Sequence, residues 1–223
     1  MVARPRAAHR VRLALHQSSL SERVRVIHYF SPMSGFAYLG FAELCAMAKR
    51  HGAELDHRPV DIARVFAAVD TTAPARQSPA RLAWRRTDMM RWAQRRALPL
   101  NAMPKHWPVD ATLASCAIIS AQSLCADTAP FINAILSAVW ARDEDIANEQ
   151  TIAALAQACE LDAAQVLADA RSDAVRATYD ANTQAAISHG VIGSPTLRIG
   201  AENFFGQDRL DFVEAELARI NLA

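Results

Sequence analysis

Strand-like sequence occurs near both ends of this chain, and a long helical stretch separates the two parts. Over residues 24–30, β-branched and aromatic residues alternate as in a strand, and residues 36–48 carry apolar residues at helical spacing. Residues 54–61 indicate a second short strand, so the N-terminal part is β-α-β. Near the other end, residues 195–205 are typical of a hairpin and residues 208–220 of a helix. Because a β-α-β part and a β-β-α part flank the middle of the chain, we expect residues 24–61 and 191–221 to lie side by side.

The sequence between these parts predicts a large helical insertion. Residues 80–190 are rich in alanine, and apolar residues recur every three or four positions, which we interpret as core packing. Residues 98–108 hold three prolines and are expected to form a loop. The predicted fold class is α/β: residues 23–79 and 191–223 form one domain, and residues 80–190 form an all-helical insertion.

Residues 1–22 differ from the rest of the chain. They contain four arginines, two histidines and no acidic residue before Glu22, and their apolar stretch is too short for a secretory signal. We predict a disordered N-terminal extension. An organelle transit peptide is the alternative that this composition leaves open.

The composition argues against several classes of protein. The 223 residues are 52% hydrophobic, which is enough for a core without a disulfide or a metal. The net charge is only +1 and the basic residues are scattered, so nucleic-acid binding is not supported. No stretch approaches the ~20 apolar residues of a membrane span.

The four cysteines carry no redox or metal signature. They form no Cys-x-x-Cys pair and no zinc spacing with histidine, so neither a metal site nor the dithiol of a disulfide oxidoreductase is expected. We interpret them as buried, reduced core residues of a cytoplasmic protein. They are Cys45, Cys116, Cys125 and Cys159.

Ser34 stands where the first predicted strand gives way to the first predicted helix. Backbone N–H groups at a helix start are unpaired and attract anions. A serine at this place can cap the helix, which is its commoner role, or it can hold a thiolate that arrives with a cofactor. The residues alone leave both roles open. His28, in the strand before it, is expected to be a buried core histidine.

Four segments of the chain match the pattern of one family in the same order. They are Ser34-Gly-Phe-Ala-Tyr-Leu-Gly40, Leu82 to Ala93, Val191-Ile-Gly-Ser-Pro-Thr196 and Phe204-Phe-Gly-Gln-Asp-Arg-Leu210. They resemble the family of 2-hydroxychromene-2-carboxylate isomerases and kappa-class glutathione transferases, over most of residues 24–221. The resemblance implies a thioredoxin-like fold of the DsbA type with a helical insertion, glutathione as cofactor, a small aromatic substrate and a homodimer.

The resemblance implies a role for Ser34 at the sulfur of glutathione. A hydrogen bond from its hydroxyl would favour the thiolate. Ser31 also begins a Ser-Pro-x-Ser motif, but the distance to Leu39 selects Ser34 as the matching residue. Ser31 falls near the end of the strand, where we expect a cap or turn role. The backbone of Ser194 would pair with the tripeptide beside a cis-Pro195, and an ordinary strand-edge proline is the alternative.

The same resemblance places further residues around glutathione. Asp208 would hold the amino group, Gln207 would share the γ-glutamyl end, and Arg209 would reach a carboxylate or brace the loop. Asp208 is equally a candidate N-cap for the last helix. Residues 70–79 are expected to form a loop before the insertion. The family's asparagine in this loop has no clear counterpart, and Gln77 is the nearest polar candidate. Gly35 stands where proline is usual and should loosen the start of the helix.

The loop over residues 98–108 offers two candidates for the second substrate. Lys105 could pair with a substrate carboxylate while Trp107 stacks on its ring. A solvated lysine on a structural loop is an equally good interpretation of Lys105.

The function implied by the resemblance is a glutathione-dependent isomerase. It would interconvert an aromatic 2-hydroxychromene-2-carboxylate and its trans-benzylidenepyruvate form by reversible addition of the thiolate. One alternative is a kappa-like glutathione transferase or peroxidase, which consumes glutathione at the same site. Another is a thioredoxin-fold protein that binds glutathione or a peptide without catalysis.

Overall fold

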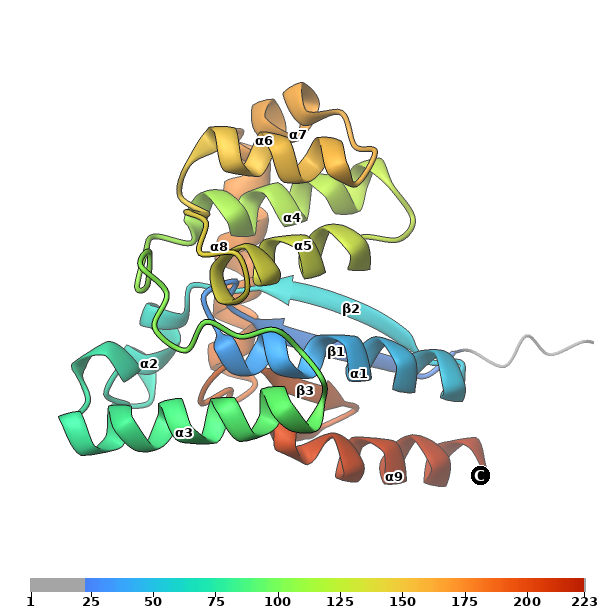
Figure 1. Cartoon of the computed structure of the whole chain (residues 1–223). Helices are drawn as coiled ribbons and strands as arrows, with labels where there is room; N and C mark the ends of the chain where they lie inside the picture. Colours follow the sequence, from blue (N-terminus) through green and yellow to red (C-terminus); the bar gives the residue numbers. More distant parts are fainter. Residues whose placement is uncertain (1–22, 223) are drawn as a thin grey trace, which may run out of the picture.

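The computed structural model describes residues 23–222 (Figure 1). The predicted N-terminal extension, residues 1–22, lies outside the described residues. A small sheet with helices on both faces forms one end of the molecule, and further helices are stacked at the other end. Within residues 23–222 no helix combines the length and the apolar content that a membrane crossing needs.

The sheet brings the two ends of the described chain together, as the sequence predicts. Its strands follow the order β2-β1-β3-β4, with β1 parallel to β2 and antiparallel to β3. Val26 in β1 lies opposite Ile199 in β3, so β1 of the N-terminal part pairs directly with the C-terminal hairpin. The strands are β1 (Arg25–Phe30), β2 (Glu54–Pro59), β3 (Thr196–Ile199) and β4 (Glu202–Phe205).

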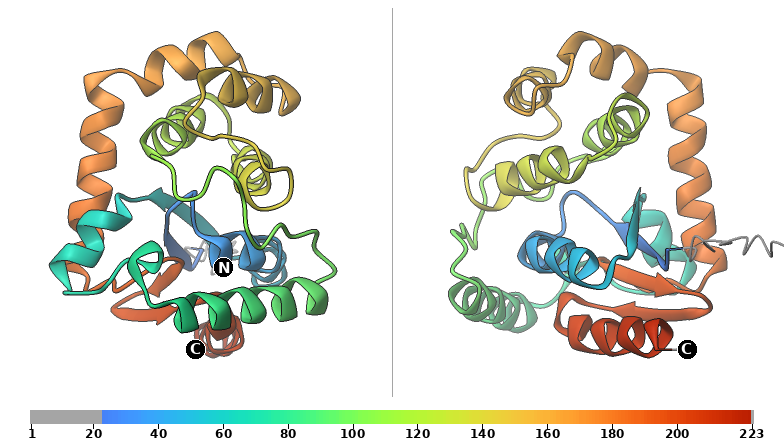
Figure 2. Two further views of the ribbon diagram at one scale, coloured as in Figure 1. Left: turned by 60° about the vertical axis from the view of Figure 1, so that its left-hand side comes forward. Right: turned by 90° about the vertical axis from the view of Figure 1, so that its right-hand side faces the viewer.

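Helices cover both faces of this sheet. On one face, apolar residues of α1 (Gly35–His51) and α9 (Leu210–Asn221) pack against β1 and β3. On the other face, α2 (Ile62–Ala68) and the end of α8 (Asp173–Ser188) pack around Tyr29 of β1. Figure 2 shows α8 standing beside the sheet on the side away from α1. Since helices cover both faces, β1 buries Val26 on one face and Tyr29 on the other.

The predicted helical insertion is confirmed as a run of helices between the two halves of the sheet. One continuous core joins it to the first part of the chain, since Phe30 of β1 and Leu39 of α1 belong to the same apolar cluster as Ile118 and Ile135. The helices of the insertion are α3 (Pro79–Arg95), α4 (Thr112–Leu124), α5 (Ala129–Trp140), α6 (Glu149–Ala158), α7 (Ala163–Ala170) and α8. The predicted proline-rich loop separates α3 from α4.

Three local features differ from the sequence prediction. Helix α2 was not expected; it is capped by Asp61, which ends up after the strand rather than in it, and at seven residues it is too short to show periodicity. A 3₁₀ turn, η1 (Pro74–Arg76), lies within the predicted loop before α3. Another, η2 (Gln207–Arg209), delays the start of α9 to Leu210.

The cysteines are free, but their predicted burial is only partly correct. Cys116 is buried, while Cys45, Cys125 and Cys159 are half-buried. Burial still raises the pKa of the Cys45 thiol to about 11, with a smaller contribution from the charge of Asp127. Since the thiolate is the reactive form, Cys45 is a poor nucleophile at neutral pH.

Candidate active site

A tight turn at the end of β1 places Ser34 at the first turn of α1. The Ser34 N–H donates to the carbonyl oxygen of Ser31 at 2.9 Å, and the Ser34 Oγ accepts from the Ala37 N–H at 3.1 Å. Ser31 has the turn role expected of it, since its Oγ accepts from the Met33 N–H at 3.4 Å. The predicted cap role of Ser34 is therefore confirmed.

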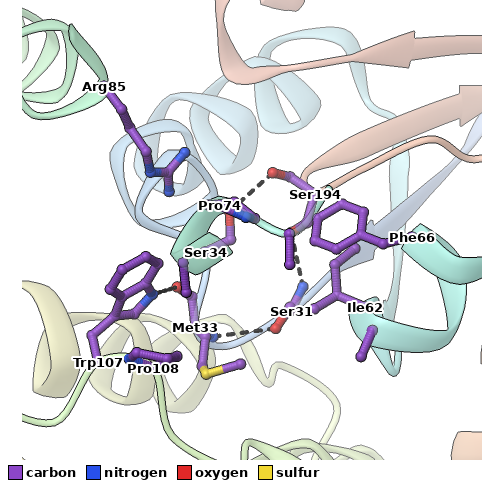
Figure 3. A pocket seen from close by; sticks show the side chains of 13 residues that line it. Ser31, Met33, Ser34, Ile62, Phe66, Pro74, Arg85, Trp107, Pro108 and Ser194 are labelled. Carbon is purple, nitrogen blue, oxygen red and sulfur yellow. Dashed lines mark hydrogen bonds between the residues drawn. The ribbon is translucent and has the colours of Figure 1, made fainter. Parts of the chain in front are cut away.

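The same hydroxyl also contacts the segment that precedes β3. Ser34 Oγ donates to the carbonyl oxygen of Ser194 at 2.9 Å, and Ser194 Oγ accepts from the Ser31 N–H at 2.9 Å. The Ser194–Pro195 peptide bond is cis, as the sequence predicts. Two segments 160 residues apart are thus joined at the N-terminus of α1 (Figure 3).

Ser34 and Ser194 face a cavity of about 160 Å³, which we call the Ser34 cavity. Trp107 also lines it, and its indole N–H donates to the carbonyl oxygen of Met33 at 3.2 Å. Side chains from α2, α3 and the proline-rich loop converge there (Figure 3). Apart from three serines and one arginine the lining is apolar: Met33, Ile62, Ala63, Phe66, Ala73, Pro74, Ala75, Trp107 and Pro108.

Arg85 is the residue of this cavity that the sequence analysis missed. It extends from α3, half-buried, and its Cζ atom lies 4.6 Å from the centre of the Phe36 ring. Among residues 23–222 its side chain makes no salt bridge. Burial lowers the pKa of the Arg85 guanidinium to about 10, opposed by the charge of Asp88. The side chain is therefore still a cation at neutral pH. The sequence does contain a signal for the position of Arg85, because Arg85 shares one helical face with the apolar residues Leu82 and Met89.

A second cavity, of about 250 Å³, adjoins the Ser34 cavity. Arg85 and Trp107 line both cavities, so these two side chains stand at the boundary between them. Beyond that boundary the lining includes Arg86, Met89 and Trp140. The planar and cationic groups therefore lie together on the side of the site that α3 and the loop form.

The residues predicted to hold the γ-glutamyl end lie in a different hollow. Gln207 and Asp208 line a space of about 430 Å³ together with Trp92 and Arg96. Gln207 is only 3% exposed, and among the described residues its Oε1 has no hydrogen-bond partner. Asp208 pairs with Arg209 at 3.2 Å and does not cap α9, so the alternative role as an N-cap is wrong.

Two other candidates lie outside the Ser34 cavity. Lys105 is exposed, and its backbone N–H, not its side chain, makes a contact, with Asp143 Oδ1 at 2.6 Å. The side-chain nitrogen of Gln77 lies 3.5 Å from the carbonyl oxygen of Thr72, within the predicted loop. The structure therefore gathers Ser34, Ser194 and Trp107, while Lys105 and Gln77 line no part of the Ser34 cavity.

Gly35 has a packing role that the sequence comparison with proline did not show. A Cβ atom at this position would lie 2.2 Å from Met89 Cε and 3.1 Å from the Trp140 ring. Glycine therefore lets α3 and α5 approach the first turn of α1 closely. The same approach brings α3, which carries Arg85, towards the start of α1.

Gly206 has a backbone conformation that favours glycine and lies close to the Asp208 side chain. Its φ is 106°, and a Cβ atom there would lie 2.3 Å from Asp208 Oδ1. We expect Gly206→Ala to lower the free energy of unfolding by about 2 kcal/mol, because this backbone region is open almost only to glycine. Gly200→Ala is the control: its φ is also positive, at 56°, but nothing lies near its Cβ. It should cost about 1 kcal/mol. Equal losses in urea denaturation would contradict the larger backbone cost expected at Gly206.

Comparison with known proteins agrees with this architecture. Residues 25–218 match the family of DSBA-like thioredoxin domains. The chain is 28% identical over 193 residues to the 2-hydroxychromene-2-carboxylate isomerase of Pseudomonas putida, covering 86% of this chain and 93% of that protein. The enzyme of the same name from Sphingobium xenophagum is 28% identical over 192 residues, covering 85% of this chain and 95% of that protein.

Solved structures show the same relationship. A 2-hydroxychromene-2-carboxylate isomerase superposes with a TM-score of 0.78 at 28% identity, covering 88% of this chain and 95% of that one. The cytosolic disulfide reductase DsbM from Pseudomonas aeruginosa, in its structure with GSH, has a TM-score of 0.64 at 17% identity and shares the fold. It covers 87% of this chain and 100% of that one.

These similarities confirm the predicted fold class and the resemblance to the isomerases. The sheet order, the cis-Pro195 beside the start of α1 and the inserted helices agree with the family match, which spans nearly all of the described residues. The chain belongs to the family of DSBA-like thioredoxin domains.

Proposed function

We propose that this protein is a glutathione-dependent isomerase that interconverts an aromatic 2-hydroxychromene-2-carboxylate and its trans-benzylidenepyruvate form. The observation that carries the proposal is the Ser34 hydroxyl, held at the N-terminus of α1 against Ser194 and facing an apolar cavity lined by Trp107. The names of the relatives that align over most of the chain support the reaction.

Ser34 is suited to stabilise a thiolate and not to react itself. Its hydroxyl hydrogen is donated to the Ser194 carbonyl, and rotation about the C–O bond would turn it towards a sulfur in the cavity. The partial positive charge at the N-terminus of α1 acts in the same direction. Each pKa unit by which the thiol is lowered corresponds to about 1.4 kcal/mol.

The groups on the chain fit glutathione, which carries a thiol, an amine and two carboxylates. The Ser194 backbone before cis-Pro195 would pair with the extended tripeptide, as a strand does with a sheet edge. The Asp208 carboxylate, 42% exposed, would hold the amine. When bound, glutathione would supply a thiolate that adds to the conjugated double bond of the substrate and leaves again after rotation.

The Ser34 cavity would hold the second substrate. Its apolar walls exclude water and suit a planar ring, and Trp107 offers an aromatic face that its hydrogen bond to Met33 keeps in place. A disulfide exchange reaction is not proposed, because the position at the start of α1 is a serine and Cys45, ten residues into the same helix, has a raised pKa.

The test is to follow isomerisation of 2-hydroxychromene-2-carboxylate by absorbance with and without glutathione. We expect turnover that requires glutathione and leaves its total concentration unchanged. Loss of free thiol in step with product would instead support a kappa-like transferase. Binding of glutathione in isothermal titration without any turnover would support a binding protein.

A further inference from the structure

The Ser34 cavity contains one cation, and the described part of the chain does not neutralise it. Arg85 lines the cavity, and in residues 23–222 no carboxylate forms a salt bridge with it. Asp88, on the same helix, is near enough to favour the charged form but makes no ion pair with it. The contact that the guanidinium does make is with the face of the Phe36 ring, which satisfies none of its five N–H groups.

An unpaired guanidinium in an apolar cavity is costly to keep. Desolvation disfavours the charge, and the partial compensation from Phe36 leaves the hydrogen-bonding edge of the group unused. A half-buried cation with free donors that faces a site is the arrangement expected for binding an anion. Arginine suits a carboxylate in particular, because its planar fork matches the two oxygens.

The side of the Ser34 cavity on which Arg85 lies indicates which of the two substrates it contacts. Ser194 and Asp208, which would hold glutathione, belong to the segments at β3 and η2. Arg85 comes from α3 and lies with Trp107 at the boundary of the second cavity, and Figure 3 shows both side chains across the cavity from Ser194. A molecule stacked on Trp107 would therefore present its acidic group to Arg85.

We propose that Arg85 is the specificity-determining residue for the second substrate, and that it binds the carboxylate of a planar apolar molecule held in the Ser34 cavity. This inference rests on the proposed function only in assigning the cavity to the second substrate. It replaces Lys105 as the partner of the carboxylate, since the Lys105 side chain lines neither cavity.

The experiment compares a planar carboxylate with a neutral molecule of the same shape. Binding of 2-naphthoate and of 2-naphthamide is measured by isothermal titration into the full-length protein and into Arg85→Met. We expect Arg85→Met to weaken 2-naphthoate binding about 30-fold, as for the loss of a charged hydrogen-bonded pair, and to change 2-naphthamide binding less than twofold. Arg85→Lys, which keeps the charge without the fork, should fall between the two.

Arg81→Met is the matched control. Arg81 is exposed, lies on the same helix and lines neither cavity, so both affinities should stay within twofold of wild type. Thermal denaturation of each variant checks that it is folded. The preference of the wild type for 2-naphthoate over 2-naphthamide is a test that does not depend on the folding of any variant. The inference is overturned if the wild type shows no such preference, if Arg85→Met loses both ligands equally, or if it weakens glutathione instead.

Failure of the proposed function would look different. A wild-type protein that prefers 2-naphthoate through Arg85 but does not isomerise 2-hydroxychromene-2-carboxylate would support this inference and contradict the proposed reaction. A protein that isomerises the substrate equally well with Arg85→Met, at unchanged KM, would support the reaction and contradict the role of Arg85.

Discussion

Replacement of Ser34 by alanine should lower kcat/KM for glutathione-dependent isomerisation by about 100-fold, which corresponds to ~2.7 kcal/mol of transition-state stabilisation. The hydroxyl is the side-chain donor held at the N-terminus of α1 in the Ser34 cavity, so no neighbouring serine can replace it without moving. The ultraviolet absorbance of glutathione bound to the variant should show less thiolate at neutral pH than glutathione bound to the wild type. Steady-state kinetics and a pH titration of that absorbance measure the two effects.

Ser172→Ala is the matched control for this change. Like Ser34, Ser172 caps a helix, accepting from the Val175 N–H at 3.2 Å and donating to the Asp169 carbonyl at 2.7 Å, but it lies at the start of α8. Both variants should lose about 1 kcal/mol of stability as caps. Only Ser34→Ala should lose activity. If the thiol of bound glutathione titrates identically in wild type and Ser34→Ala, Ser34 has no role in activating it.

Lowering the pH from 7 to 4.5 should reduce the free energy of unfolding by about 2.5 kcal/mol through His57 alone. His28 and His57 lie opposite each other on β1 and β2, and their Nδ1 atoms are 3.0 Å apart. They are 1% and 6% exposed. One ring must donate and the other must accept, so the contact is lost when both rings are protonated.

Burial lowers the pKa of His57 from 6.5 to about 4, partly opposed by the charges of Asp56 and Asp127. Burial and the neighbouring His57 lower the pKa of His28 well below its ordinary value. Between pH 6.5 and about 4 the unfolded chain therefore binds more protons than the folded one. Stability is lost as the pH falls through this window, and His28 adds to the loss with the same sign.

Urea denaturation at pH 7 and pH 4.5 tests this with a variant that cannot titrate. His57→Gln should be less stable than wild type at pH 7, because it disturbs a buried pair. However, its loss between the two pH values should be smaller than that of wild type by about 2 kcal/mol. An unchanged difference in His57→Gln would show that other groups cause the acid sensitivity.

Much of the fold could be predicted because its signals are local. The alternation in β1, the helical spacing in α1 and the turn residues of the β3–β4 hairpin each depend on neighbours in sequence. The cap role of Ser34 and the burial of His28 belong to the same class. Helix α2 was missed because seven residues do not show a clear period. The two ends of the chain were also expected side by side, and β1 does pair with β3.

The candidate site, by contrast, depends on which elements touch. In sequence, Gln207 looked like a surface ligand, but η2 turns its side chain inwards beside Gly40. A Cβ atom added to Gly40 would lie only 2.7 Å from the Cβ atom of Gln207. Arg85 looked like one of several scattered arginines, yet α3 places it in the Ser34 cavity. The partner of His28 is set by the register of β1 and β2.

The sequence by itself determined most of the elements, the family and the place of Ser34, because repeated spacing and short motifs encode backbone conformation directly. Only the tertiary structure decided that Ser34, Ser194, Trp107 and Arg85 meet around one cavity. These residues come from α1, the segment before β3, the proline-rich loop and α3. Their meeting depends on close packing of α3 and α5 against Gly35, and such distances between distant segments leave no period or motif in the chain.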